Sequence, residues 1–158
     1  MGQFQIIRAT ELWQQTGAYY VRIQGMGRQH NISLREEFDE HDGPDTKYIV
    51  ILDGLFPIAT ARFYELDDKT VMIGRVVVLP EYRGKGLGSM TIKAAEEWIR
   101  ELGYRHIRID ARDVAVGFYE KLGFSAREPL TVEWGNFRCI RMEKDIFSQT
   151  RAIYERKA

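Results

Sequence analysis

Hydrophobic and polar residues recur along the chain with two different periods, and these periods predict strands that alternate with helices. Seven segments show the alternation and the β-branched or aromatic content of strands. The predicted strands are Phe4–Ile7, Lys47–Leu52, Phe56–Tyr64, Thr70–Leu79, His106–Ala111, Leu130–Trp134 and Phe137–Met142. Asp53-Gly54 and Gly135-Asn136 suit hairpin turns between the strands on either side of them.

Helical spacing dominates the N-terminal part of the chain. It runs from Trp13 to Phe38, and Gly25-Met26-Gly27 predicts an interruption that leaves two helices. Thr10 is the expected N-cap of the first helix, and a turn dense in acids, Asp39–Asp45, follows the second. Because strands and helices alternate, we expect one compact α/β domain over residues 1–158, with residues 145–158 as a C-terminal helix or tail.

Two further helices follow glycine-rich or polar loops. Apolar residues from 87 to 102 form one stripe, which predicts a helix over Gly86–Leu102 with Gly103 as its C-cap. The segment Val114–Leu122 predicts a shorter helix that ends at Gly123.

Composition and charge exclude several classes of function. The chain has 158 residues, 44% of them hydrophobic, and its 23 basic and 23 acidic residues give a net charge of zero. No overall positive field attracts nucleic acid, and no apolar run reaches the roughly 20 residues that a membrane span needs. The N-terminus does not have the pattern of a signal peptide, and Cys139 has no second cysteine for a disulfide or a thiolate metal site. We therefore expect a cytoplasmic protein without a metal.

The stretch VLPEYRGKGLGS, residues 78–89, lies between a predicted strand and a predicted helix. Its three glycines let the backbone turn tightly and approach a ligand, and the helix that follows leaves its first N–H groups unpaired. Arg83 and Lys85 add positive charge at the same place. The loop is therefore a predicted binding site for a phosphate or pyrophosphate, although a connector without a ligand would have the same composition.

Two familiar phosphate motifs do not fit this loop. The nucleoside-triphosphate loop needs Ser or Thr after its Gly-Lys pair, and Lys85 is followed by Gly86. The dinucleotide fingerprint needs two residues between its second and third glycines, and Gly86 and Gly88 are separated by one. A nucleotide-binding module is accordingly the weaker alternative.

Two motifs resemble those of the GNAT superfamily of N-acetyltransferases. Arg83-Gly84-Lys85-Gly86-Leu87-Gly88 matches Arg/Gln-x-x-Gly-x-Gly/Ala, the loop that binds the pyrophosphate of acyl-CoA in that family. Ala115–Phe124, AVGFYEKLGF, is similar to the family's helix with Phe-Tyr-x-x-x-Gly-Phe. The two motifs stand in the family's order, separated by one helix and one strand. The chain most resembles a bacterial branch of small GNAT proteins.

The resemblance implies a fold and a cofactor. The fold would be the single-domain GNAT fold of the α/β class, a mixed central sheet flanked by helices, in which Val71–Leu79 and His106–Ala111 are parallel and splay apart. Acetyl-CoA would be the co-substrate, with its pantetheine arm on the backbone of Val76 and Val78, and no metal would be needed. The implied cofactor-binding residues are Val76, Val78, Arg83, Gly84, Lys85, Gly86, Leu87, Gly88, Ser89, Asp113 and Phe118. Asp113 stands where the family often has asparagine, and an ionised carboxylate accepts but does not donate.

The resemblance also implies the reaction, transfer of acetyl from acetyl-CoA to a primary amine of a small molecule or peptide in a ternary complex. Tyr119 matches the family's tyrosine beside the thioester sulfur. Proton transfer from a tyrosine of pKa about 10 to a thiolate of about 8.5 is uphill by about 2 kcal/mol. Tyr119 is therefore expected mainly to donate a hydrogen bond to the sulfur.

The general base and the acceptor pocket stay open. The strand leading to the glycine loop contains neither Glu nor His, so Glu65, Asp39, Asp110 and His106 are the alternatives for the base. Arg62, Arg75 and Arg138 would line an acceptor pocket if their strands face the cofactor, which would favour an acceptor with a carboxylate or phosphate.

A different class of function remains beside the enzyme: a non-catalytic module that binds or senses acyl-CoA and keeps the glycine loop without turnover. For either class we expect no nucleic-acid or membrane partner. A homodimer formed through the C-terminal strands would be in keeping with the family.

Overall fold

The computed structural model describes residues 4–134 and 137–146. The chain divides into two compact units. The first comprises Met1–Tyr64 and Ile73–Glu97, and the second comprises Glu65–Met72 and Trp98–Ala158. Gly135-Asn136 and the C-terminal segment 147–158, for which we predicted a turn and a helix or tail, lie outside the described residues.

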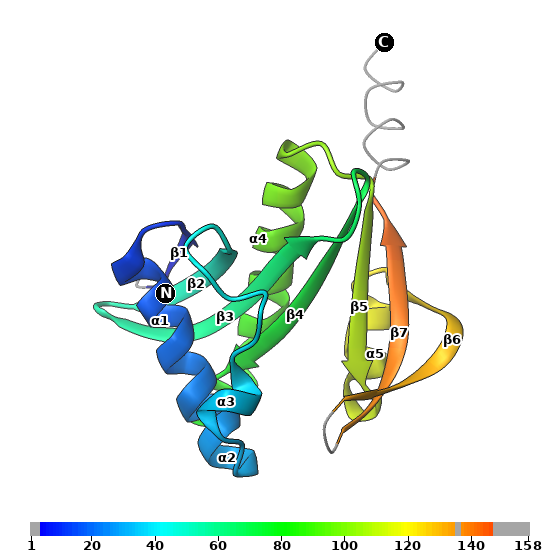
Figure 1. Ribbon diagram of the computed structural model, residues 1–158. Coiled ribbons are helices and arrows are strands. Elements are labelled where there is room, and N and C mark those ends of the chain that lie inside the picture. Colours follow the sequence, from blue (N-terminus) through cyan, green and yellow to red (C-terminus); the bar gives the residue numbers. More distant parts are fainter. Residues whose placement is uncertain (1–3, 135–136, 147–158) are drawn as a thin grey trace. The chain divides into compact units, whose positions relative to one another are not determined.

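The elements follow one another as strands and helices, as the hydrophobic pattern predicts (Figure 1). In chain order they are β1 Phe4–Ala9, α1 Leu12–Arg22, a π-helical turn Ile23–Gly27, α2 Arg28–His30, α3 Leu34–Glu37, β2 Lys47–Asp53, β3 Phe56–Glu65, β4 Thr70–Val78, a 3-10 turn Pro80–Tyr82, α4 Leu87–Glu101, β5 His106–Arg112, a 3-10 turn Asp113–Ala115, α5 Val116–Lys121, β6 Ser125–Trp134 and β7 Phe137–Asp145. No helix in the described part of the chain has both the length and the apolar content needed to cross a membrane.

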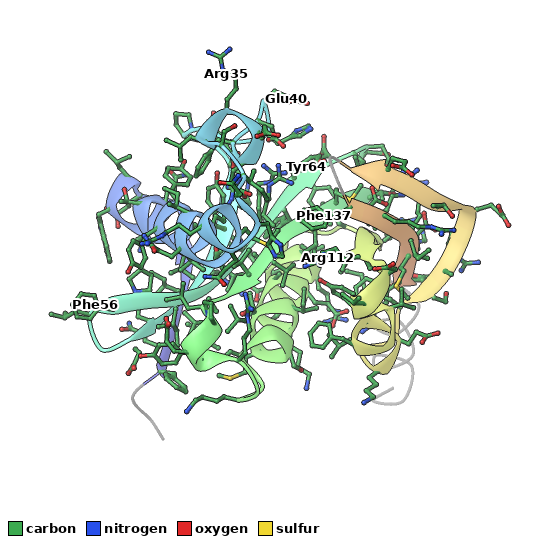
Figure 2. The ribbon with its side chains drawn as sticks, turned by 90° about the horizontal axis from the view of Figure 1, so that it is seen from below. Arg35, Glu40, Phe56, Tyr64, Arg112 and Phe137 are labelled. Atoms are coloured by element: carbon green, nitrogen blue, oxygen red, sulfur yellow. The ribbon has the colours of Figure 1, made fainter. Side chains whose placement is uncertain are left out.

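The first unit contains strands in the order β1-β2-β3-β4. β1 pairs with β2 and β2 with β3 in antiparallel registers, and Lys47 lies opposite Phe63 near one end of the second pair. The predicted hairpin at Asp53-Gly54 is confirmed, because Gly54 has the positive φ, 61°, that tight hairpin turns require. Phe56, just past this turn, is 70% exposed at the tip of the hairpin (Figure 2).

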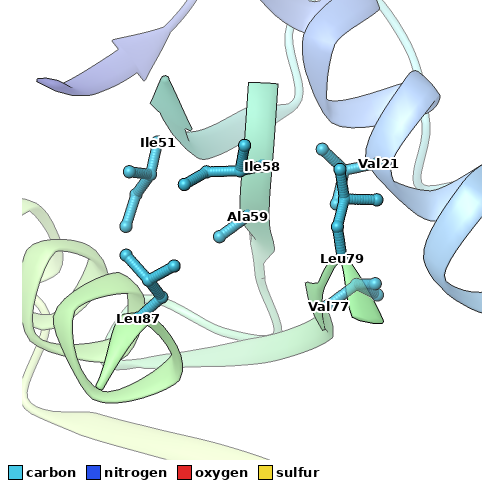
Figure 3. Close-up of a cluster of buried hydrophobic side chains, with 7 residues drawn as sticks. All are labelled: Val21, Ile51, Ile58, Ala59, Val77, Leu79 and Leu87. Atoms are coloured by element: carbon cyan, nitrogen blue, oxygen red, sulfur yellow. The ribbon is translucent and has the colours of Figure 1, made fainter. Parts of the chain in front are cut away.

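The core of the first unit contains residues from helices α1 and α4 and from the strands. Figure 3 shows a buried cluster that is contributed by α1, β2, β3, the end of β4 and the start of α4. Its members are Val21, Ile51, Ile58, Ala59, Val77, Leu79 and Leu87. Leu87 is 1% exposed, so the beginning of α4 is anchored directly in the core. The glycine-rich loop that precedes α4 is therefore attached to a fixed helix end.

Gly25 lets the π-helical turn approach strand β4 closely. A Cβ added at Gly25 would lie 2.4 Å from Cγ1 of Val77, a distance at which one of the two elements must move. We expect Gly25→Ala to lower the free energy of unfolding by about 1–3 kcal/mol, the range for overpacking a filled core. Gly43→Ala is the matched control, because no heavy atom lies within 4 Å of its added Cβ. Urea denaturation of both variants measures the two free energies of unfolding. An equal decrease in Gly25→Ala and Gly43→Ala would contradict the prediction.

Two sequence-based expectations in the N-terminal helices are wrong. Gly25-Met26-Gly27 does not end the helix but continues it as a π-helical turn, and the chain leaves the helix later, where Asn31 has a φ of 54°. The N-cap of α1 is Glu11, not Thr10. The Gln14 side chain accepts hydrogen bonds from the N–H groups of both Thr10 and Glu11, which fixes the helix start one residue later.

The second unit contains strands in the order β5-β7-β6, and both of their pairings are antiparallel. Strand β6 begins at Ser125, earlier than the predicted Leu130. A register shift between Ala126 and Thr131 interrupts its pairing with β7, and this irregular polar stretch conceals the strand from the alternation pattern. The C-terminal end of α5 is attached to β7, since Nζ of Lys144 donates to the carbonyl of Leu122 at 2.8 Å.

Candidate active site

The glycine-rich loop follows directly from strand β4. The N–H of Leu79 donates to the carbonyl of Ile58 on β3, and a 3-10 turn then leads into the loop. Gly84 and Gly86 have φ values of 80° and 79°, and no heavy atom lies within 4 Å of a Cβ added at either position. Backbone conformation, not crowding, therefore requires glycine at both positions, and the space beside the loop is open.

The loop ends where α4 begins, at Leu87. The first N–H groups of a helix of 15 residues have no partner within the helix and carry a partial positive charge. Lys85 is exposed just before them. Open backbone, helix N–H groups without a partner in the helix and an exposed lysine thus lie at the loop for which the sequence predicts an anion site.

Two side chains brace this loop. The Arg83 guanidinium donates from Nε to the carbonyl of Val78 at 3.1 Å and from Nη2 to the carbonyl of Gly25 at 3.3 Å. The Tyr82 hydroxyl donates to Oδ2 of Asp53 at 2.6 Å, which raises the pKa of Tyr82. The loop is thus attached to β4, to the π-helical turn and to the end of β2, and all of these contacts lie within the first unit.

Tyr119 belongs to α5 in the second unit, where it is 6% exposed. Its ring meets the edges or faces of Phe118 and Phe124 in near-perpendicular contacts, with centroids 4.9 Å and 5.9 Å away. Burial raises the pKa of Tyr119 well above its ordinary value. The hydroxyl consequently stays protonated at neutral pH and is suited to donate a hydrogen bond, not to release its proton.

Phe118 and Asp113, two other expected cofactor contacts, also lie in the second unit. Phe118 is 37% exposed, so part of its ring is accessible from solvent. Oδ1 of Asp113 accepts a hydrogen bond from the N–H of Val114 at 2.8 Å and so stabilises the start of its own 3-10 turn. One carboxylate oxygen of Asp113 is therefore engaged locally.

Three of the alternatives for a general base have partners in the second unit. Glu65 accepts a hydrogen bond from the Tyr104 hydroxyl at 2.6 Å, and this bond raises the pKa of Tyr104 to about 12. Asp110 is paired with Arg141, whose Nε donates to it at 2.9 Å. His106, the third, lies with its Nδ1 4.0 Å from a carboxylate oxygen on β7. The geometry singles out none of the three as a base.

A buried group of six charged residues lies in the first unit, and we name it the arginine–carboxylate cluster. Its members come from α1, from the end of α3, from the segment between α3 and β2, and from strands β3 and β4. Three of them are positive and three are negative. They are Arg22, Glu37, Asp39, Asp42, Arg62 and Arg75. Arg35 and Glu40, from the same part of the chain, point outward and are not members (Figure 2).

Arg22 is the most buried member, with a side chain that is 0% exposed. Its Nε donates to Oε2 of Glu37 at 2.9 Å and its Nη1 to Oδ1 of Asp42 at 2.7 Å. Burial alone would lower the pKa of Arg22, but the bonds to these two carboxylates outweigh it and raise the pKa. The face of Phe38 covers the guanidinium at 4.4 Å. The buried positive charge of Arg22 is thus compensated by two carboxylates and by the face of an aromatic ring.

Arg62 pairs with Asp39 and shares Asp42 with Arg22. Its Nη1 lies 2.8 Å from Oδ1 of Asp39 and 3.1 Å from Oδ2 of Asp42. Burial would raise the pKa of Asp39, but the hydrogen bond and the charge of Arg62 lower it. Asp39 is thus an ionised partner of an arginine and a poor general base.

The three arginines expected to line an acceptor pocket have different surroundings. Arg62 and Arg75 are brought together in the cluster, and Arg138 lies exposed on β7 in the second unit. Because carboxylates of the protein neutralise Arg62 and Arg75, the charge argument for an anionic acceptor loses its basis at these two residues.

Asp42 is expected to stabilise the fold in a pH-dependent way. Burial opposes its ionisation, but hydrogen bonds from Arg22, from a backbone N–H and from Tyr48 lower its pKa strongly. Because the pKa of Asp42 is lower in the folded state than its value of about 3.9 in the unfolded state, ionised Asp42 stabilises the fold at neutral pH. This stabilisation is lost progressively as the pH falls below about 5. We expect Asp42→Asn to lower the free energy of unfolding by about 2 kcal/mol at pH 7. The stability of this variant should also decrease less on acidification than that of the unsubstituted protein.

Urea denaturation at pH 7 and at pH 3 measures both effects of Asp42→Asn. Asp45→Asn is the matched control, because Asp45 is exposed in the same turn. If Asp42→Asn unfolded with the same pH dependence as the unsubstituted protein, the contribution assigned to Asp42 would be wrong.

Arg75 has a backbone conformation that is rare within a strand. Its φ is 52°, in the left-handed region, and Asn31 is the other non-glycine residue of the described chain with a positive φ. This conformation costs a residue with a side chain about 1–2 kcal/mol. Burial and the neighbouring charge of Arg62 lower the pKa of Arg75, which nevertheless stays charged. The surrounding contacts must hold this conformation in place.

Comparison with known proteins decides the family. The model of the acetyltransferase (GNAT) family matches residues 9–124, which is more than half of the chain. The chain belongs to the GNAT acetyltransferase family. This membership agrees with both sequence motifs, since the match includes the glycine-rich loop and the helix with Tyr119.

Known relatives give the same assignment. An uncharacterised acetyltransferase of Streptococcus pyogenes serotype M1 is 30% identical over 113 residues, which cover 72% of this chain and 79% of that protein. The uncharacterised N-acetyltransferase YjcF of Bacillus subtilis is 31% identical over 107 residues, which cover 68% of this chain and 75% of YjcF.

A solved structure confirms the GNAT fold. A crystal structure from Lactobacillus plantarum, of a protein assigned as an N-acetyltransferase, superposes with a TM-score of 0.84 at 29% identity. The superposition covers 90% of this chain and 97% of the other. The fold class predicted from the sequence, a mixed α/β GNAT fold, is confirmed.

The sequence analysis missed three members of the arginine–carboxylate cluster, Arg22, Glu37 and Asp42. It also missed Tyr48, whose hydroxyl donates to Oδ1 of Asp42. One signal for them exists in the sequence. Arg22 continues the buried face of α1 that includes Ala18, and a charged residue on such a face needs a buried partner.

The described residues contain no group of three or more His, Cys, Asp or Glu side chains arranged to hold a metal ion.

Proposed function

We propose that this GNAT protein is an acetyl-CoA-dependent N-acetyltransferase that acts on a primary amine of a small molecule or peptide. The observation that carries the proposal is the loop between β4 and α4, where Gly84 and Gly86 have positive φ and open space beside them. Family membership supports acyl-CoA as its ligand. We take residues 1–158 as one GNAT domain, which is consistent with a family match that spans both compact units.

Each part of the cofactor has a proposed partner. The N–H groups of residues 84–89, with Lys85 and Arg83, bind the pyrophosphate by hydrogen bonds and charge. The backbone of Val76 and Val78 binds the amide groups of the pantetheine arm. Arg83 already donates to the carbonyl of Val78, so its guanidinium would link the pyrophosphate loop to the strand that binds the arm.

The proposed reaction is direct attack of the neutral amine on the thioester carbonyl. The nitrogen forms a bond to the carbonyl carbon, the oxygen becomes an oxyanion near the N–H of Val78, and the carbon–sulfur bond then breaks. The proton that leaves the nitrogen balances the charge of the departing thiolate. Tyr119 donates a hydrogen bond to the sulfur, in agreement with the raised pKa of its hydroxyl.

The acceptor must reach the site as a free amine. An alkylamine of pKa about 10.4 is only about 0.04% neutral at pH 7, which corresponds to about 4.6 kcal/mol. Asp39, Glu65 and Asp110 are all engaged with other side chains. We therefore propose that water takes up the proton of the amine, or that the acceptor has an amine of low pKa that is already neutral. We therefore favour acceptors whose amine pKa lies well below that of lysine.

Calorimetric titration of acetyl-CoA into the purified protein tests the proposal, with ATP as the control ligand. Binding at micromolar concentrations, with no heat from ATP, is the expected result. Absence of acetyl-CoA binding would overturn the proposed function. A panel of amines then separates an enzyme from a non-catalytic acyl-CoA sensor, because only the enzyme releases free thiol in proportion to acetylated amine.

A further inference from the structure

The left-handed residue in β4 lies immediately before the backbone groups that we assign to the cofactor. Arg75 precedes Val76 directly and Val78 by three positions. A residue in the left-handed region within a strand redirects the peptide that follows it, so the N–H and C=O groups of that peptide point in a different direction from those of a regular strand. The conformation of Arg75 therefore decides where the groups of Val76 and Val78 point.

The guanidinium of Arg75 is fixed by the segment that carries the acidic residues. Its Nε and Nη2 donate to the carbonyl of Glu37 at 3.1 Å and 2.9 Å, and Nη2 also donates to Oδ2 of Asp39 at 3.2 Å. Nε lies 3.2 Å from a carboxylate oxygen of Glu37 as well. The side chain of Arg75 is 10% exposed, so these contacts are largely sheltered from water.

The two carboxylates that hold Arg75 are themselves held by the other arginines of the cluster. Glu37 is bound by Arg22, and Asp39 is bound by Arg62. The guanidinium of Arg75 is consequently attached to a charged framework and not to one mobile side chain. Such a framework can hold a backbone conformation that the residue would not adopt by itself.

We propose that Arg75 is a positioning residue for acyl transfer. Its guanidinium, anchored by Glu37 and Asp39, fixes the left-handed turn in β4 and so directs the backbone groups of Val76 and Val78 toward acyl-CoA. This inference rests on the proposed function. It assigns Arg75 a different role from binding an anionic acceptor, because here the residue acts through the backbone of its own strand.

Three variants test the role of the guanidinium. Arg75→Ala removes the anchor and keeps a Cβ, and Arg75→Gly removes the anchor but tolerates the left-handed conformation without strain. Arg35→Ala is the matched control, an arginine that is exposed and directed outward (Figure 2). Two quantities are measured for each protein: acetyl-CoA affinity by calorimetry, and hydrogen exchange of the Val76 and Val78 amides by NMR.

Both Arg75 variants are expected to bind acetyl-CoA about tenfold more weakly or worse, since groups displaced by about 1 Å lose much of their effect. Amide exchange at Val76 and Val78 should accelerate in both variants and stay unchanged in Arg35→Ala. If Arg75→Gly kept full affinity and unchanged exchange, the guanidinium would not be the anchor, and the proposal would be overturned.

Asp39→Asn provides a second route if Arg75→Ala does not fold. It leaves Arg75 in place and removes one of its charged partners, so it should accelerate exchange at Val76 and Val78 to a smaller extent. Failure of the unsubstituted protein to bind acetyl-CoA would overturn the proposed function instead. Amide exchange, which needs no cofactor, would then still decide whether Arg75 fixes strand β4.

Discussion

Replacing Gly86 with glutamate is expected to abolish acetyl-CoA binding while leaving the protein folded. The glutamate would have to adopt a φ of 79°, and it would project into the open space where the pyrophosphate is proposed to bind. A carboxylate at this point repels a phosphate and occupies its place. Calorimetry should show a loss in affinity of about a thousandfold or more, because two unfavourable effects act at one position.

Gly54→Glu is the matched control for the effect of backbone strain. Gly54 also has a positive φ, 61°, and no heavy atom lies within 4 Å of its added Cβ. It lies in the hairpin between β2 and β3, so the same substitution there should lower stability to a similar extent and leave acetyl-CoA affinity unchanged. A folded Gly86→Glu protein that binds acetyl-CoA normally would remove the loop from the cofactor site.

Replacing Tyr119 with phenylalanine is expected to slow acetyl transfer by about one to three orders of magnitude, the range for losing one hydrogen bond or acid at a reacting group. The ring contacts with Phe118 and Phe124 should survive, so the fold and acetyl-CoA affinity should be retained. Single-turnover measurement of thiol release separates this loss in kcat from any change in binding.

Tyr104→Phe controls for the loss of a tyrosine hydroxyl. Tyr104 donates to Glu65 in the same unit, and its removal should cost a little stability without slowing transfer. Equal rates for Tyr119→Phe and the unsubstituted protein would exclude the Tyr119 hydroxyl from the reaction.

The regular elements are predictable from the sequence because their period is set by burial on one face. The helix α4 runs from Leu87 to Glu101, within a residue of the prediction at each end, and Gly103 ends it with a φ of 93° as a C-cap requires. The glycine loop is predictable for the same local reason. Its positive φ values at Gly84 and Gly86 follow from the residue type.

The arginine–carboxylate cluster was not predictable, because its partners are distant in the sequence. Arg22 and Asp42 are 20 residues apart, and Arg75 and Glu37 are 38 apart. Acidic side chains are normally solvated, so nothing local shows that Glu37, at the end of α3, will be 2% exposed beside two arginines. The left-handed conformation of Arg75 is likewise imposed by tertiary contacts, against the preference of the residue.

The cluster also restricts how this protein can change over evolutionary time. Loss of any one of its six charges leaves a buried ion uncompensated, whereas replacing both members of a pair by apolar residues removes the problem. A substitution at Arg22 should therefore be inherited together with one at a carboxylate partner, Glu37 or Asp42, and not singly. Among homologous sequences, these positions are expected to co-vary, and a variant library should recover paired replacements where the corresponding single ones fail.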